Sequence, residues 1–206
     1  IRMFSDMLKS FETNFTKPEL YDAIYFSALK GDPDCGGLVS YNYFSGEPIT
    51  GLEEGRPMVI RRPDSSFTLP NFSRNLIYST MATLKLGMDI LTENENVRLD
   101  QLMGHGGLFK TEGVGQKLMS GALNVPVTVM ESAGEGGAWG IALLARYMLK
   151  KSDGETLESY LDNKVFVNYT GKKVEPDSTD IAGFASYMDN YKKCLPAEKA
   201  AAEYFR

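Results

Sequence analysis

Two glycine clusters, each at the point where a short apolar strand gives way to a helix, constrain this chain more than any other feature. The first cluster lies within residues 103–111, after an expected strand over 97–103. The second, Gly134 to Gly137, follows an expected strand over 125–130. Glycine has no β-carbon, so a ligand can approach the backbone of such a turn closely. The repeated order of strand, glycine turn and helix predicts an α/β fold with a nucleotide at the first turn.

Two common nucleotide motifs do not fit these turns. The phosphate-binding P-loop needs glycine immediately before its lysine, whereas Phe109 precedes Lys110. The dinucleotide fingerprint needs a third glycine to pack the helix on the strand, and Phe109 and Trp139 occupy the two candidate positions. Neither motif is present at these turns. A simpler interpretation stays open, in which the glycines only cap helices and make tight turns.

Length, charge and apolar content limit the classes of protein. A chain of 206 residues can bury a substantial core. Its net charge of −5 provides no basic surface for nucleic acid, and no apolar run approaches the length of a membrane span. Cys35 and Cys194 lack metal-ligand spacing and are expected to be ordinary thiols of a reducing compartment. We therefore expect a cytoplasmic protein without nucleic-acid or membrane partners.

The elements before the first glycine cluster begin with two expected helices, over residues 4–11 and 18–30. An aromatic-rich strand over 37–44 and a charged connector over 51–69 follow. The next helix is the longest. Its apolar residues recur at spacings of four, three, four and three, which predicts one face buried in the core: Ile77, Met81, Leu84, Met88 and Leu91.

Besides the strand over 125–130, five further elements are expected after the first glycine cluster. A helix over 112–123 carries Val114, Leu118 and Ala122 on one side. The helix after the second cluster carries a narrow apolar stripe that favours tight packing, and a helix over 156–161 and a hairpin over 165–174 follow. A terminal helix from Asp180 should pack on the body of the protein. The stripe consists of Ala138, Ile141, Ala142, Ala145 and Leu149, and the terminal face of Ile181, Phe184, Met188, Tyr191 and Leu195.

The run from 67 to 147 resembles the C-terminal domain of the FGGY carbohydrate kinases, a family that includes glycerol kinase, xylulokinase and ribulokinase. Its members carry a Gly-Gly-Gly/Ala loop before a helix, and later a Glu-Ala-Gly-Ala-x-Gly-Ala-Ala helix. The tripeptide at 106–108 and the segment at 135–142, Glu-Gly-Gly-Ala-Trp-Gly-Ile-Ala, match these in order and spacing. Residues 37–47 are similar to the stretch before the family's signature region. The resemblance covers roughly residues 37–205.

The resemblance implies an actin-like ATPase domain related to ribonuclease H, with a mixed sheet flanked by helices. It divides the chain into a helical lead-in (1–36), a core (37–151) and C-terminal helices with a hairpin (152–206). The N-terminal domain of the kinase is absent from this chain. In the family the glycine loop borders the adenosine of ATP, so four residues are expected to contact the nucleotide: Gly106, Gly107, Leu108 and Thr111. Leu108 replaces a smaller residue, and Thr111 replaces asparagine.

The resemblance also implies an activity, which is transfer of a phosphoryl group from ATP, with Mg²⁺, to a pentulose such as ribulose or xylulose. The family's catalytic aspartate and β-phosphate loop lie upstream of the matched region, and nothing in residues 1–36 resembles them. We therefore expect no catalytic residue here and no activity of this chain alone. Its expected partners are the sugar and the N-terminal kinase domain, and a homodimer stays open. The alternatives are another actin-like ATPase and a non-catalytic module with the same fold.

Several single polar residues have expected roles of their own. His105, the only histidine, is expected to have a structural role, and Lys110 to be solvated unless it reaches a phosphate. Asn42 and Glu47 lie near the expected cleft, where a fold-stabilising role is favoured over contact with sugar. Three carboxylates are expected to be ordinary surface or paired groups: Asp64, Asp89 and Asp100.

Overall fold

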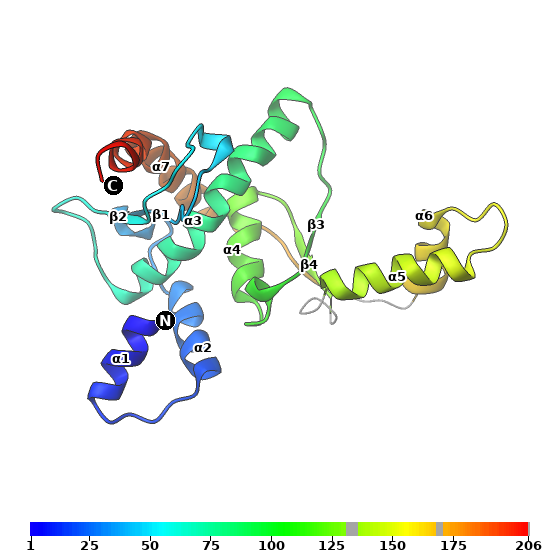
Figure 1. The fold of residues 1–206 in the computed structure, drawn as a ribbon, viewed down its shortest axis with the longest axis horizontal. Coiled ribbons are helices and arrows are strands. Elements are labelled where there is room, and N and C mark those ends of the chain that lie inside the picture. The colour runs from blue at the N-terminus through cyan, green and yellow to red at the C-terminus, as the bar shows by residue number, and fades with distance from the viewer. Residues whose placement is uncertain (131–135, 168–170, 206) are drawn as a thin grey trace.

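A computed structural model describes residues 1–130, 136–167 and 171–205 of the chain. Helices surround two small sheets (Figure 1). The helices are α1 (Arg2–Ser10), α2 (Lys17–Ala28), α3 (Leu69–Asp89), α4 (Val114–Leu123), α5 (Gly136–Lys150), α6 (Leu157–Tyr160) and α7 (Ser178–Tyr204). The strands are β1 (Val39–Tyr41), β2 (Met58–Ile60), β3 (Leu102–Gly104), β4 (Val127–Val129) and β5 (Lys172–Val174). Within the described residues, no helix is both long and apolar enough to cross a membrane.

The two sheets differ in the direction of their strands. The strands β1 and β2 pair antiparallel. In the second sheet, β4 lies between β3, which runs parallel to it, and β5, which runs antiparallel. This second sheet is the expected mixed one. The strand β2 lies inside the predicted connector, where the sequence prediction had no strand.

The predicted hairpin over 165–174 is wrong in its pairing. Its second half is β5, which pairs with β4. Val165 ends a π-helical turn, Leu161–Val165, that continues α6. Gly171, where the hairpin was expected to turn, directly precedes β5, and residues 168–170 lie outside the described residues. Pairing with the buried edge of β4 replaces the local hairpin.

The predicted core face of α3 is correct only in its first half. Ile77 and Met81 are buried, whereas Leu84 and Leu91 are each more than two-fifths exposed. Tyr78 is fully buried one position away from the predicted stripe. Figure 1 shows why, since α3 crosses the body and its C-terminal end then extends beyond the neighbouring elements. A regular apolar spacing does not record where along a helix the neighbours end.

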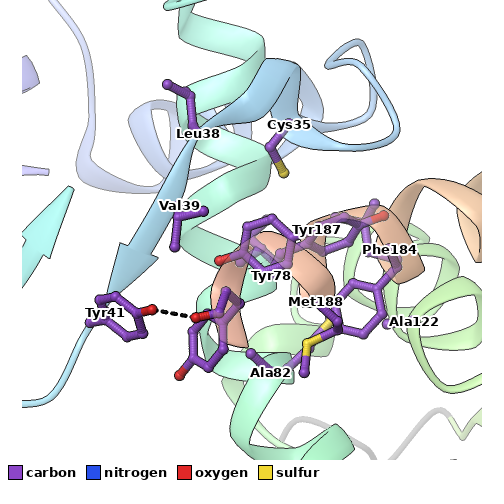
Figure 2. Close-up of a cluster of buried hydrophobic side chains, with 14 of the residues drawn as sticks. Cys35, Leu38, Val39, Tyr41, Tyr78, Ala82, Ala122, Phe184, Tyr187 and Met188 are labelled. Carbon is purple, nitrogen blue, oxygen red and sulfur yellow. Dashed lines mark hydrogen bonds between the residues drawn. The ribbon is translucent and has the colours of Figure 1, made fainter. Parts of the chain in front are cut away.

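The main core lies where β1, α3, α4 and α7 meet. The ring of Tyr78 meets that of Phe184 edge to face, with centroids 4.8 Å apart at 84°, and Tyr187 packs beside both (Figure 2). Edge-to-face packing of this kind adds about 0.5–1.5 kcal/mol to the burial of the rings. The predicted faces of α4 and α7 are confirmed, since Val114 and Leu118 are fully buried on α4, and Phe184, Met188 and Tyr191 are buried on α7.

The apolar stripe on α5 does not pack as expected. No residue of α5 is buried, and Ile141 and Leu149 are 69% and 81% exposed. The helix projects from the body with α6 beside it (Figure 1). The two helices hold together through the rings of Tyr147 and Tyr160, with centroids 5.3 Å apart. The prediction of tight packing along this stripe is wrong for the described structure.

A buried carboxylate on α7 predicts an unusual pH dependence of stability. Glu198 has no exposed surface, and its Oε1 accepts a hydrogen bond of 2.6 Å from the backbone N–H of Arg56. Desolvation raises the pKa of this carboxyl, partly offset by that hydrogen bond and by the Arg56 charge. A raised folded-state pKa contributes stability that is present below the unfolded-state pKa and lost as pH rises through the folded-state pKa.

Glu198→Gln is therefore expected to raise the melting temperature at pH 7, because the amide keeps an acceptor for Arg56 and removes the buried charge. Each 1 kcal/mol regained corresponds to about 2–4 °C in a protein of this size. Near pH 4 the gain should shrink, because protonation already neutralises the carboxyl there. Circular-dichroism melts at both pH values test this, and an equal shift at both would contradict it.

Candidate functional site

The strands that precede the two glycine clusters end at the same edge of the second sheet. The strands β3 and β4 are parallel, with Gly104 opposite Val129, so both strands end at the carboxyl edge of the sheet. Ligands of α/β folds commonly bind at this edge. The helix α5 begins close to the first turn, since a β-carbon at Gly136 would lie only 2.5 Å from Nδ1 of His105. Gly134 and Glu135 of the second cluster lie outside the described residues.

The first turn presents a stretch of bare backbone. Gly106 has φ 99°, a conformation that favours glycine, and Gly107–Phe109 forms a 3₁₀ turn after it. Among the described residues, a β-carbon at Gly106 or at Gly107 would meet no other atom within 4 Å. We refer to Gly106 and Gly107 as the glycine wall. Space beside this wall is open to a ligand.

The glycine wall is supported from behind by two side chains of its own turn. The ring of Phe109 covers Gly104, where a β-carbon would lie 2.6 Å from it. Leu108 packs on Gly115 of α4 at a similar separation. Gly104 and Gly115 are both buried. These contacts hold the backbone of the turn in one conformation. A fixed backbone is suited to binding a rigid ligand.

An apolar cavity of about 450 Å³ reaches the turn at Leu108. This volume lies within the roughly 300–1,000 Å³ of small-molecule sites. Neither α1 nor α2 was expected at the site. Tyr21 and Tyr25 nevertheless stand four positions apart on α2, and both line the cavity. The cavity is lined by Ile1, Phe4, Tyr21, Ile24, Tyr25, Ser73, Leu76, Ile77, Thr80 and Leu108.

Thr111 is held by a residue that the sequence analysis also missed. Its side chain is 8% exposed, and its hydroxyl donates a 2.7 Å hydrogen bond to Oδ1 of Asp22 on α2. The hydroxyl oxygen keeps lone pairs for a further donor. Thr111 therefore joins the glycine turn to α2 and offers only an acceptor to a ligand.

Thr111→Val is expected to lower the free energy of unfolding by about 1 kcal/mol, because the isosteric side chain cannot donate to Asp22. This corresponds to about 2–4 °C in melting temperature. Asp22→Asn keeps an acceptor oxygen and is the matched control, so it should lose less. Chemical denaturation of the three proteins tests the contact, and a valine variant as stable as the parent would contradict it.

His105 and Lys110 both lie on the surface of the first turn. His105 lines a second pocket of about 310 Å³ together with Trp139 and Gly140 of α5. Its ring fills the space that a side chain at Gly136 would occupy, which agrees with the expected structural role. Lys110 ends the 3₁₀ turn.

The three carboxylates that were expected to be ordinary surface or paired groups belong to ion pairs. Asp64 pairs with Arg62 at 3.1 Å, Asp89 with Lys85 one turn earlier on α3, and Asp100 with Arg98 at 4.0 Å. The expected role as ordinary paired carboxylates is thereby confirmed. Over 1–130, 136–167 and 171–205, no three acidic, histidine or cysteine side chains gather as a metal site.

The two cysteines behave as ordinary thiols. Both are free, and Cys35 is buried in the main core. Burial raises the pKa of the Cys35 thiol well above its usual value, which disfavours the reactive thiolate. The cysteines therefore add no chemistry to the glycine wall, whose geometry is suited to binding.

Comparison with known proteins gives one family and several solved structures of similar fold. The model of the FGGY family of carbohydrate kinases, C-terminal domain, matches residues 8–149. A ligand-bound xylulose kinase from Lactobacillus acidophilus is similar at a TM-score of 0.70 and 19% identity, over 89% of this chain and 36% of that one. No curated protein matches the sequence.

Two other solved structures agree. A gluconate kinase from Lactobacillus acidophilus has a TM-score of 0.69 at 19% identity, over 89% of this chain and 35% of that one. The glycerol kinase of Plasmodium falciparum with ADP has a TM-score of 0.65 at 18% identity, over 95% of this chain and 36% of that one. The chain thus spans about a third of the length of the solved structures it matches. The likeness confirms the predicted actin-like α/β fold.

Proposed function

This chain belongs to the FGGY family of carbohydrate kinases, as their C-terminal domain, and from that premise we propose that it holds the adenine nucleotide of an ATP-dependent sugar kinase. The nucleoside lies against the glycine wall, Gly106 and Gly107. The observation that carries the proposal is the open backbone there, at the carboxyl edge of two parallel strands. Membership in the family favours a sugar kinase over the alternative of a chaperone or cell-shape ATPase.

Each residue of the proposed site has a distinct task. The two glycines let the flat base and the ribose approach the backbone, and Leu108 lines the apolar side. Thr111 donates its hydrogen to Asp22, so its oxygen accepts from the exocyclic amino group of adenine. This division of donors and acceptors favours ATP over GTP, which carries a carbonyl at that position.

The described residues of this chain gather no group of three or more acidic, histidine or cysteine side chains that could hold Mg²⁺ by themselves. Mg²⁺ in kinases is commonly held by one or two carboxylates together with the phosphates of the nucleotide, so we propose that it binds with the phosphates of ATP. Phosphoryl transfer depends on positioning by both walls of a cleft. The contribution of this chain is to bind and orient the nucleoside, while the catalytic base and the phosphate loop belong to the N-terminal kinase domain, its proposed partner.

The proposed acceptor is a pentulose such as ribulose or xylulose, phosphorylated at a primary hydroxyl. Similarity to a xylulose kinase supports this class of substrate. The gluconate and glycerol kinases among the similar folds name other acceptors, so the sugar has to be found by experiment.

The test is a coupled ADP-release assay and a thermal-shift assay on the intact kinase that contains this chain. ATP at a hundred times its Kd should add about 2.7 kcal/mol of apparent stability. ADP release is expected with ribulose or xylulose, and gluconate, glycerol and erythritol serve as comparisons. Absence of any stabilisation by ATP would favour a non-catalytic module. Turnover with glycerol alone would overturn the proposal that the acceptor is a pentulose.

A further inference from the structure

The apolar cavity that reaches Leu108 differs in chemistry from the open backbone of the glycine wall. The helices α1 and α2, which lie at one side of the body (Figure 1), form part of its lining, and α3 forms another part. Over the described residues, no charged side chain lines this cavity. An ion that entered it would lose hydration and gain no opposite charge. The cavity therefore disfavours charged groups, including the phosphates of a nucleotide.

Aromatic rings supply a large part of this lining. Tyr21 and Tyr25 lie on α2 with their ring centroids 6.4 Å apart, and Phe4 of α1 also lines the cavity. Burial raises the pKa of the Tyr25 hydroxyl, which therefore stays a neutral phenol near pH 7. Aromatic side chains pack favourably on other rings in offset or edge-to-face arrangements. The lining is therefore suited to a planar aromatic molecule.

One buried hydroxyl in the lining has no hydrogen-bond partner. Ser73 of α3 is 1% exposed, and its Oγ is unpaired among the described residues. By contrast, Ser79 and Thr80 of the same helix donate to the backbone carbonyls of Leu76 and Ile77. A buried hydroxyl without a partner is costly, so a ligand that pairs with Ser73 gains affinity. The cavity thus offers one polar contact in apolar surroundings.

The volume of the cavity and the weak attachment of α1 permit a small molecule to enter. Apolar cavities of about 150 Å³ bind benzene, so this one, of about 450 Å³, has room for a larger ring system. No residue of α1 is buried, and its Phe4 meets Phe72 of α3 edge to face with centroids 6.3 Å apart. Elements with few buried contacts open at a low cost in free energy. The helix α1 can therefore move aside to admit a ligand.

A nucleobase is a poor match for this cavity. Adenine carries several ring nitrogens and an amino group, each of which needs a hydrogen-bond partner when it is buried. The lining side chains offer only hydroxyls, and the hydroxyl of Thr80 already donates to Ile77. A ligand in the cavity is therefore separate from a nucleoside against the glycine wall, although Leu108 adjoins both.

We propose that the cavity between α1, α2 and α3 binds an uncharged aromatic molecule that carries a single hydroxyl or N–H group. The ring of the ligand packs against Tyr21 and Tyr25, and its polar group forms a hydrogen bond with the hydroxyl of Ser73. This ligand site goes beyond the proposed kinase function, because its chemistry requires neither the sugar nor the nucleotide.

The experiment is a fluorescence titration of the intact kinase that contains this chain with 2-naphthol, an uncharged ring system with one hydroxyl. The anion 2-naphthoate has the same rings and is expected to bind at least about tenfold more weakly. Naphthalene lacks the hydroxyl and should also bind about tenfold more weakly than 2-naphthol. Ser73→Ala should weaken 2-naphthol binding about tenfold and leave naphthalene binding unchanged, because only 2-naphthol pairs with the serine.

Ile24→Trp is expected to fill the cavity and abolish binding of 2-naphthol. Phe26→Trp is the matched control, because Phe26 lies on the same helix, is 47% exposed and is not among the residues that line the cavity. Circular dichroism verifies that each variant is folded. Equal affinity for 2-naphthol and 2-naphthoate, or 2-naphthol affinity unchanged in Ser73→Ala and Ile24→Trp, would overturn the proposal.

Competition with ATP separates this site from the proposed nucleotide site. Displacement of 2-naphthol by ATP would overturn the proposal, since the nucleoside would then occupy the cavity. Simultaneous binding of both ligands is the expected result. Absence of ATP binding together with normal 2-naphthol binding would count against the glycine wall only.

Discussion

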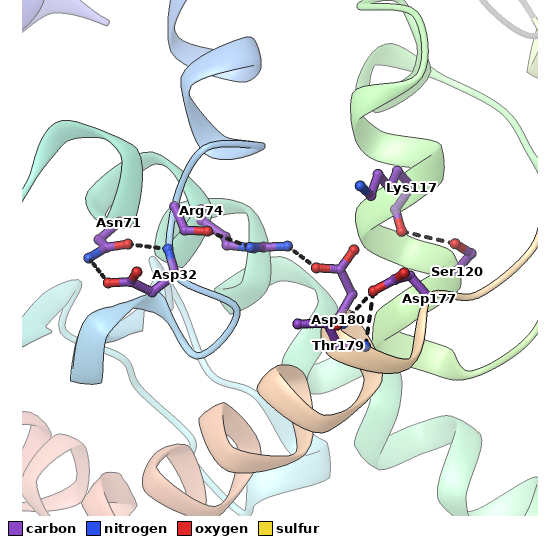
Figure 3. Close-up of polar contacts among 9 residues, drawn as sticks. Asp32, Asn71, Arg74, Lys117, Ser120, Asp177, Thr179 and Asp180 are labelled. Atoms are coloured by element: carbon purple, nitrogen blue, oxygen red, sulfur yellow. Dashed lines mark hydrogen bonds and ion pairs between the residues drawn. The ribbon is translucent and has the colours of Figure 1, made fainter.

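Arg74→Met is expected to lower the free energy of unfolding by about 3–5 kcal/mol, because it leaves a buried carboxylate without its partner. Arg74 and Asp180 are 3% and 5% exposed, and the guanidinium bonds Oδ1 of Asp180 (Figure 3). A second guanidinium nitrogen donates to the carbonyl of Gly31 at 2.7 Å. The pair joins α3 to the first turn of α7, so its loss loosens two elements of the core.

Double substitution separates the strength of this pair from the penalty of an unpaired charge. In the described structure Nε of Arg74 and Oδ2 of Asp180 have no partner, so the network is only partly satisfied. Replacing both residues by apolar ones, Arg74→Met with Asp180→Leu, should therefore recover much of the lost stability. Lys85→Met removes an i,i+4 pair on the same helix and should cost only about 0.3–0.5 kcal/mol.

Urea denaturation measures all four proteins under the same conditions. A loss below about 1 kcal/mol for Arg74→Met would mean that water reaches Asp180 and that the pair is not buried in solution. A double variant as unstable as Arg74→Met alone would mean instead that the guanidinium stabilises the core by its packing over Tyr78, 5.3 Å from the ring centre.

The fold was predictable from sequence where periodicity and burial coincide. The faces of α4 and α7 follow their apolar spacing because other elements cover both helices along most of their length. The second half of α3 and the stripe of α5 have equally regular spacing, yet they stay exposed. A periodic pattern encodes an apolar face and contains no information about which element covers it.

Short strands escaped prediction for a related reason. The three residues of β2 stand between charged and proline-containing segments and become a strand only by pairing with β1, almost twenty positions earlier. The partner of β5 is likewise distant along the chain, since Lys172 pairs with Val129 of β4 and not with the residues just before it. Pairing energy of this kind is set by the tertiary fold, which local propensity does not contain.

The site was predictable in its backbone and unpredictable in its side-chain contacts. Two parallel strands that each precede a glycine cluster end at the same edge of their sheet, and the structure has that geometry at Gly104 and Val129. The contact between Thr111 and Asp22 spans 89 positions, and no local signal marks an aspartate on α2 as its acceptor. Likewise, the sequence suggested Asn42 and Glu47 only as isolated polar residues, and the fold gathers them around one pocket.

Gly107→Val is expected to weaken ATP binding at least a hundredfold while it changes the free energy of unfolding by no more than about 0.5 kcal/mol. A hundredfold loss of affinity corresponds to about 2.7 kcal/mol. The residue is exposed, its φ is not in the left-handed region, and a β-carbon there meets no atom of the described part of the chain within 4 Å. The valine is therefore tolerated by the fold, and its methyl groups occupy the space proposed for the nucleoside.

Gly87→Val is the matched control because a β-carbon there also meets no atom of the described residues within 4 Å, and Gly87 lies near the C-terminal end of α3, where that helix extends beyond the neighbouring elements (Figure 1). Its ATP affinity should equal that of the parent. Gly106 is unsuitable for this comparison, since any side chain at φ 99° strains the backbone and would confuse folding with binding. Calorimetric titration with ATP on the intact kinase, paired with urea denaturation, measures both quantities. Undiminished ATP affinity in Gly107→Val would mean that the nucleoside does not lie against this backbone.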